Sequence, residues 1–248
     1  MNKTVLITGS SRGIGAETAR VFARHGYDVC LNYKSNQQAA IALQAEIVAL
    51  GVKCIAVRAD VSDEAEVLRL FETVDAEFGL LSVLVNNAAI LKPQARLTEL
   101  TAERVNAILT ANVTSAFLCS REAVKRMSTK SGGQGGAIIN VSSAAARTGS
   151  PNEYIDYAAS KGAVDTLTKG LAMEVAAEGI RVNCVRPGLI YTDMHADGGE
   201  PNRVDRLASK LPMQRGGQAS EVAEAIYWLA SDKSSFATAN FIDLAGGL

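Results

Sequence analysis

Short runs of apolar, β-branched residues recur along the chain and alternate with longer stretches of helical spacing. The runs predict strands buried on both faces, and they lie at residues 3–8, 28–33, 53–58, 81–85, 137–141, 181–186 and 240–244. Helical patterns fill most intervals, at about 16–24, 37–50, 64–78, 101–127, 153–178 and 220–231. Strands that alternate with helices through short loops predict an α/β fold, a doubly wound parallel sheet with helices on both faces, in one domain over residues 1–248.

Three of the longer segments have features of their own. Within 153–178, an apolar stripe at every fourth residue is predicted to face the core: Ala163, Leu167, Leu171 and Val175. Asn112 lies inside the helical stretch 101–127, where asparagine is unfavourable unless its side chain or local backbone has a task. The segment at about 189–217 is polar and glycine-rich, and it is long enough to serve as a substrate lid.

Composition narrows the class of protein. The chain has 248 residues, a net charge of -1 and a pI of about 6.2, so no basic excess indicates nucleic acid or an anionic membrane as partner. No apolar run reaches the length of about 18 residues that would span a bilayer. The chain has only two histidines, and its cysteines are scattered, which predicts buried reduced thiols in a cytoplasmic protein and no metal site: Cys30, Cys54, Cys119 and Cys184.

A glycine-rich turn follows the first predicted strand directly. It carries Gly9, Gly13 and Gly15 and leads into a helix. Glycines let a backbone approach a pyrophosphate closely, and a helix N-terminus offers free N–H groups and the positive end of a dipole. The alternative is an ordinary tight turn between strand and helix, but the placement of all three glycines favours a nucleotide-phosphate loop.

The end of the second predicted strand bears on cofactor choice. It reads Asn32-Tyr33-Lys34, without the carboxylate that often holds the adenosine ribose hydroxyls. Lys34 and Arg12 are placed to flank a ribose 2′-phosphate, so we expect NADP(H) to be preferred over NAD(H). The alternative for Lys34 is a solvated loop charge. Asp60, at the end of the third strand, is a candidate acceptor for the adenine amino group, or else the N-cap of the next helix.

Candidate chemistry lies at Tyr157 and Lys161, one helical turn apart on a single face. An ammonium beside the phenol is expected to lower the tyrosine pKa from its usual value of about 10, which would permit acid/base work near neutral pH. The alternative is an ordinary amphipathic surface. Ser143, after the fifth predicted strand, is placed to hydrogen-bond a substrate carbonyl, although a serine there can also cap a turn.

In this order and at these separations, the motifs resemble those of the classical short-chain dehydrogenase/reductases over essentially the whole chain: Thr8-Gly-x-x-x-Gly-x-Gly15, Asn86-Asn-Ala-Ala89, Asn112, Ser143, Tyr157-x-x-x-Lys161 and Pro187-Gly188. The resemblance implies a Rossmann-type domain with about seven parallel strands, usually assembled as a homotetramer. It implies hydride transfer between NADP(H) and a small-molecule carbonyl or secondary alcohol. Tyr157 would be the general acid/base, and Lys161 would lower its pKa and hold the nicotinamide ribose. Ser143 would polarise the carbonyl, and Asn112 would hold a relay water.

The resemblance also implies the cofactor contacts. The phosphates would meet Gly9, Ser11, Arg12, Gly13, Ile14 and Gly15, and the adenine would meet Asp60 and Val61. Asn87 and Ala88 would lie along the ribose, and the nicotinamide would meet Pro187, Gly188, Ile190 and Thr192. Members with arginine in the glycine loop and Asn32-Tyr33-Lys34 after the second strand usually take NADP(H).

The chain departs from the family's commonest pattern in two places. The interval from Ser143 to Tyr157 is one residue longer, which leaves Ser142 as a minor candidate. Many 3-oxoacyl-carrier-protein reductases carry an arginine where this chain has Met173, which weakens that alternative assignment. A lyase of the halohydrin dehalogenase type and a non-catalytic NADP(H)-binding regulator are further alternatives. A sugar, a β-ketoester and a small diketone stay open as substrates, with four residues that suggest a polar one: Arg147, Glu153, Tyr154 and His195.

Overall fold

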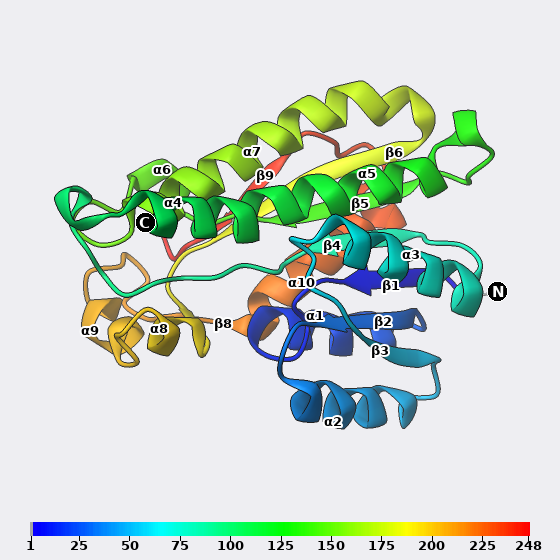
Figure 1. Cartoon of the computed structure of the whole chain (residues 1–248). Coiled ribbons are helices and arrows are strands. Elements are labelled where there is room, and N and C mark those ends of the chain that lie inside the picture. Colours follow the sequence, from blue (N-terminus) through cyan, green and yellow to red (C-terminus); the bar gives the residue numbers. More distant parts are fainter. Residues whose placement is uncertain (1) are drawn as a thin grey trace.

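The computed structural model describes residues 2–248 (Figure 1). Seven parallel strands form one sheet in the order β3-β2-β1-β4-β5-β6-β9, which confirms the doubly wound α/β prediction. Their bounds are β1 Thr4–Ile7, β2 Asp28–Tyr33, β3 Cys54–Arg58, β4 Val83–Asn86, β5 Gly136–Val141, β6 Ile180–Pro187 and β9 Phe241–Leu244. The strand order reverses between β1 and β4, and in such sheets ligands bind outside the carboxyl ends of the strands at this point.

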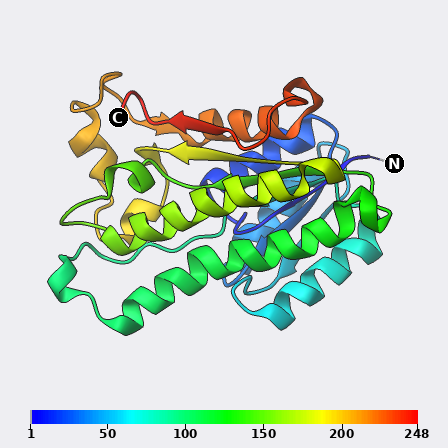
Figure 2. The ribbon, with the colours of Figure 1, turned by 90° about the horizontal axis from the view of Figure 1, so that it is seen from above.

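Helices cover both faces of the sheet (Figures 1 and 2). One face carries α1 Gly13–Arg24, α2 Gln37–Val48 and α10 Ala219–Ala230, and the other carries α3 Glu64–Phe78, α5 Ser115–Met127 and α7 Ile155–Val175. Leu6 and Ile7 are adjacent on β1 and fully buried, yet they belong to the two different apolar cores. The strands are therefore buried on both sides, as their uninterrupted apolar runs predict.

Two shorter parts of the chain modify this plan. The expected helix over 101–127 consists of α4 Ala102–Leu109 and α5, joined by a π turn at Thr110–Thr114. The short helix α6 Ala145–Thr148 follows β5, and 3₁₀ turns lie at Leu97–Glu99, Thr129–Ser131, Ala176–Glu178 and Asp232–Ser234. Among residues 2–248, no helix is long and apolar enough to cross a membrane, and no group of His, Cys, Asp and Glu side chains could hold a metal ion.

The glycine-rich segment over 189–217 contains secondary structure of its own. Strands β7 Ile190–Tyr191 and β8 Gly217–Gln218 pair in parallel, and between them lie helices α8 Met194–Asp197 and α9 Arg203–Ala208. Figure 1 shows α8 and α9 beyond the carboxyl ends of the central strands. This position is the one that a cover over the ligand site would occupy.

The prediction for the core face of α7 is wrong. Val164, Thr168 and Ala172 are buried together with Val175, whereas the other members of the predicted stripe, Ala163, Leu167 and Leu171, are only half-buried. A strict four-residue repeat drifts around a helix of 3.6 residues per turn, so the core face mixes steps of three and four. Thr168 is accommodated because its hydroxyl donates to Val164 O at 2.8 Å and accepts from Asn140 at 2.8 Å.

Candidate active site

The glycine turn lies between β1 and α1 and packs against the segment that follows β4. Gly9 and Gly13 have φ values of +61° and +57°, which side-chain-bearing residues rarely adopt. A Cβ on Gly9 would lie 2.9 Å from Ala88 Cα. Thr8 Oγ1 accepts hydrogen bonds from the N–H groups of Asn87 and Ala88 at 3.0 Å each. The two strand ends are therefore fastened together, with the glycine backbone at their surface.

A cavity of about 440 Å³ opens beside this turn. It brings together most of the residues predicted to contact a dinucleotide: Gly9, Ser11, Arg12, Gly13, Ile14, Asn32, Tyr33, Lys34, Asp60, Val61, Asn87, Ala88 and Thr192. Gly15 is the exception among the glycines, because it lines no described cavity and a Cβ there would lie 2.6 Å from Asn87 Nδ2. Its role in this structure is close packing of α1 on the strand ends.

The charged residues at this cavity are paired with carboxylates. Lys34 Nζ lies 2.6 Å from Asp60 Oδ2, and Arg12 is paired with Asp197 of α8. The alternative role of Asp60 as a helix N-cap is wrong, because Asp63 fills it by accepting from Glu66 N. Helix α1 has no side-chain N-cap, so its first N–H groups are available to a phosphate. With glycines where a Cβ would block approach, the residues fit a dinucleotide.

A second cavity, of about 160 Å³, adjoins the first and contains the predicted catalytic residues. Ile14, Asn87 and Thr192 line both cavities, so the two spaces meet. The second cavity is also lined by Ser143, Tyr157, Lys161, Pro187, Gly188 and Ile190, all of them predicted from the sequence. The carboxyl ends of β4, β5 and β6 bring these distant segments to one edge of the sheet.

Ser142 and Ser143 have different surroundings although they are neighbours after β5. Ser142 is 2% exposed, and its hydroxyl donates to Lys161 O at 3.1 Å. Ser143 is half-buried, and its side chain forms a hydrogen bond with Tyr157. The geometry therefore favours Ser143 over Ser142 as the serine that meets a ligand.

Comparisons with known proteins agree with this arrangement. A protein-family model described as "Enoyl-(Acyl carrier protein) reductase" matches residues 9–248. The uncharacterized oxidoreductase YgfF of Escherichia coli (strain K12) is 61% identical over 242 residues, covering 98% of each chain. The 3-oxoacyl-[acyl-carrier-protein] reductase FabG of Staphylococcus aureus (strain Mu50) is 37% identical over 248 residues, covering 100% of this chain and 98% of that one. The chain is a classical short-chain dehydrogenase/reductase.

Solved structures of this family share the fold closely. A short-chain dehydrogenase from Burkholderia cenocepacia J2315, solved in complex with NADP, superposes with a TM-score of 0.89 at 34% identity, covering 99% of this chain and 97% of that one. A short-chain type dehydrogenase/reductase from Mycobacterium marinum gives a TM-score of 0.92 at 32% identity, with coverage of 99% and 94%. The protein is thus an oxidoreductase of a family that binds a nicotinamide cofactor.

The acidity expected of Tyr157 is not found in this structure of the dehydrogenase/reductase. Burial raises the pKa of Tyr157 to about 12, although the hydrogen bond with Ser143 acts in the opposite direction. Lys161 is 3% exposed, and burial lowers its own pKa to about 8. Its Nζ donates to Val141 O at 2.8 Å and lies 5.5 Å from the Tyr157 ring centroid. The direction predicted from helical spacing is wrong here because desolvation outweighs the ammonium.

Asn112 occupies the π turn between α4 and α5 and is 2% exposed. Its Oδ1 accepts from Ile90 N at 2.7 Å, and its Nδ2 donates to Ile90 O at 3.1 Å and to Ser160 Oγ at 3.1 Å. Ser160 Oγ in turn donates to Tyr157 O at 2.7 Å. The unfavourable helical asparagine therefore has the task that its position predicts: it ties the strand-end loop to the helix that carries Tyr157. π turns are frequent at functional sites.

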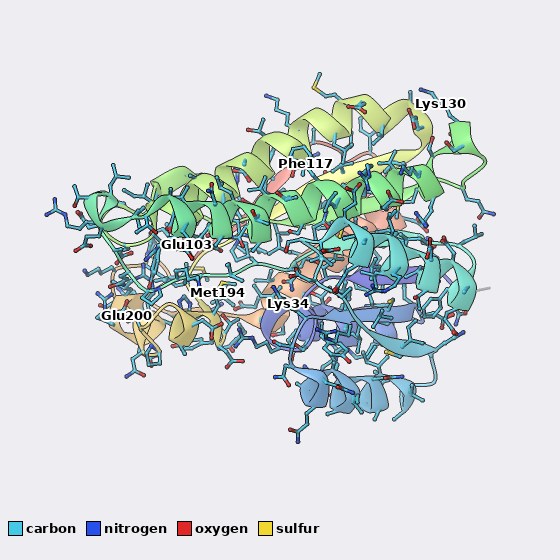
Figure 3. The ribbon with its side chains drawn as sticks, in the orientation of Figure 1. Lys34, Glu103, Phe117, Lys130, Met194 and Glu200 are labelled. Atoms are coloured by element: carbon cyan, nitrogen blue, oxygen red, sulfur yellow. The ribbon has the colours of Figure 1, made fainter. Side chains whose placement is uncertain are left out.

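Several residues of the site escaped sequence reasoning. Met194 lines both cavities, and Figure 3 shows it on the same side of the molecule as Lys34. Leu91, Leu189 and Arg203 line the smaller cavity. None of these belongs to a motif, and each reaches the site through the loop after β4 or the segment over 189–217. Of the four polar candidates for the substrate cavity, Tyr154 and His195 line it, whereas Arg147 and Glu153 do not.

Proposed function

We propose that this dehydrogenase/reductase transfers hydride between NADP(H) and a carbonyl or secondary alcohol, with Tyr157 as general acid/base. The observation that carries the proposal is the meeting of the two cavities. One holds the glycine turn and the other holds Tyr157, Ser143 and Lys161, so a dinucleotide in the first would present its end to the phenol in the second. The resident chemistry of the cofactor is hydride transfer, and the protein supplies position and the proton.

The preference for NADP(H) rests on charge. Arg12 and Lys34 both line the larger cavity, and β2 ends without a carboxylate that would repel a 2′-phosphate. Their present partners, Asp197 and Asp60, form exposed ion pairs that hold the cations only weakly. A phosphate dianion would form stronger charge-assisted hydrogen bonds with the same groups.

In reduction, Tyr157 would give its proton to the carbonyl oxygen while Ser143 donates a hydrogen bond to the same atom. The raised pKa of Tyr157 keeps the phenol protonated at neutral pH, as a general acid requires. Lys161 would hold its ammonium below the ring, and the chain of Asn112, Ser160 and the Tyr157 carbonyl fixes the start of α7. Fixed donors of this kind stabilise negative charge as it develops on the oxygen.

The test is oxidation of NADPH by the purified protein, followed by the loss of nicotinamide absorbance with a panel of carbonyl compounds. We expect turnover with at least one class and a lower KM for NADPH than for NADH. Binding of NADPH without turnover of any carbonyl or alcohol, in either direction, would favour a regulator and refute the proposal.

A second candidate is reduction of a 3-oxoacyl group on a carrier protein, which the 37% identity to FabG favours. Against it, Met173 stands on α7 with 74% of its surface exposed, where many such reductases present an arginine to the acidic carrier. Acetoacetyl carrier protein as substrate separates the two. A kcat/KM well above that of free small ketones would favour the carrier-protein reductase.

We also propose assembly as a homotetramer through the long helices of the α5 and α7 face. Phe117 on α5 is 51% exposed and lies on the outer surface of the helix layer (Figure 3). Met173 on α7 is also exposed. Large apolar side chains on helices that no other element covers are typical of subunit interfaces. Light scattering of the purified protein gives the mass, and a monomer at micromolar concentration would refute the assembly.

A further inference from the structure

The size of the smaller cavity limits what it can hold beside the cofactor. Its volume is about 160 Å³, and its lining includes Ile14, Pro187 and Thr192, which belong to the predicted nicotinamide contacts. A cavity of about 150 Å³ accommodates one benzene molecule. Part of the space would be taken by the nicotinamide, so the remainder admits a compound of only a few carbon atoms.

The side chains at this cavity that can carry positive charge number three among the described residues: Lys161, His195 and Arg203. Lys161 lies below Tyr157 and donates to Val141 O. His195 has its Nε2 at 3.0 Å from Ile190 O, so this nitrogen carries the proton. Its Nδ1 is buried without a partner, and burial lowers the pKa of the ring. His195 is therefore neutral and offers no charge to a carboxylate.

Arg203 is the remaining cation, and two carboxylates hold it. Its Nη1 donates to Glu153 Oε1 at 2.9 Å and to Glu200 Oε2 at 3.0 Å, and its Nη2 is paired with the second oxygen of Glu153. Arg206 is paired with Glu200 as well, so the cluster contains two arginines and two glutamates and has no net charge. The guanidinium also stacks over the Tyr154 ring at 5.1 Å. It is only 9% exposed, so little water screens these pairs.

We propose that the substrate is a small, uncharged carbonyl compound or its alcohol, and that Arg203, neutralised by Glu153 and Glu200, sets this preference. The inference rests on the hydride-transfer function proposed above. An anionic group entering the cavity would find its one candidate partner already bonded to carboxylates, and burying an unpaired charge is costly. The class therefore includes small diketones and ketoesters and excludes the corresponding keto acids.

The test uses two pairs of substrates matched in shape, butane-2,3-dione against pyruvate and ethyl acetoacetate against acetoacetate, with the wild-type protein and NADPH. We expect the neutral member of each pair to have the higher kcat/KM by about a hundredfold, the ratio that an unpaired buried charge produces. Equal or better reduction of the acids overturns this inference and leaves the proposed function standing. Absence of turnover with all four overturns both.

A variant separates the role of Arg203 from cavity size alone. In the double variant Glu153→Gln/Glu200→Gln, the guanidinium keeps its neighbours but loses their charge. The neutral-to-acid ratio of kcat/KM should fall by about tenfold or more, the effect of one partly screened charge pair. Arg203→Gln is the matched control, and it should leave the ratio at or above that of the wild type. An unchanged ratio in the double variant, or a lower ratio in Arg203→Gln, overturns the assignment to Arg203.

Discussion

Replacement of Lys34 by alanine should raise the KM for NADPH and leave the KM for NADH almost unchanged. Lys34 lines the dinucleotide cavity, and its side chain is 70% exposed. Its Nζ lies 2.6 Å from Asp60 Oδ2 in the structure without cofactor. Only NADPH carries the 2′-phosphate that would replace this carboxylate as partner of the ammonium.

The size of the effect follows from the two partners. A hydrogen bond between charged groups contributes about 1.5–3 kcal/mol, and the exposed pair with Asp60, given up on binding, is worth about 0–1 kcal/mol. The difference of about 1–2 kcal/mol corresponds to a rise of about 5- to 30-fold in the KM for NADPH. The effect should shrink as salt is raised, because the side chain is exposed and salt screens its charge.

The matched control is Lys130→Ala. Lys130 has a similar exposure of 68% and is paired with Glu178 at 3.0 Å, but it lies far from Lys34 (Figure 3). Steady-state kinetics with both cofactors, at saturating carbonyl substrate, should show no change in this variant. An equal rise for NADPH and NADH in Lys34→Ala, or no rise for either, would refute the assignment of Lys34 to the 2′-phosphate.

Two further perturbations test the glycine turn and the proton donor. Gly9→Ala should lower the free energy of unfolding by about 2–4 kcal/mol in urea melts, because φ is +61° and the new Cβ would meet Ala88 at 2.9 Å. Gly26→Ala, with φ +77° and nothing within 4 Å, should cost only about 1–2 kcal/mol; equal losses would contradict the packing argument. Alcohol oxidation should accelerate as pH rises from about 6 to 9, because only the phenolate accepts a proton and the raised pKa of Tyr157 keeps it scarce. Carbonyl reduction should stay level until about pH 8, where Lys161 begins to lose its proton; an oxidation rate that falls over this range would contradict it.

The parts that local sequence decides were predictable. Gly9 and Gly13 follow β1 directly, and Ser143 follows β5, so each lies at a carboxyl strand end once the strands are assigned. Parallel strands place all such ends at one edge of the sheet. This is why residues far apart in the chain could be assigned to one site before their contacts were known.

The parts that depend on three-dimensional contacts were not predictable from pattern. Helical spacing places Lys161 one turn from Tyr157, but it says nothing about how deeply the pair is buried or that Nζ turns to Val141 O, and both decide the direction of the tyrosine pKa. The pairing of Arg203 with Glu153 joins segments 50 residues apart. No periodicity in the segment over 189–217 marks that contact.

The most direct test of the central claim is hydride transfer in Tyr157→Phe, compared with Tyr154→Phe. Both tyrosines line the smaller cavity, but the Tyr154 hydroxyl already donates to Gly198 O at 3.2 Å. We predict that Tyr157→Phe binds NADPH with its affinity nearly unchanged and loses about 10²- to 10⁴-fold in the single-turnover rate, the usual contribution of a general acid. Tyr154→Phe should lose at most about tenfold, because a single neutral hydrogen bond is involved. Near-normal turnover in Tyr157→Phe would contradict the account.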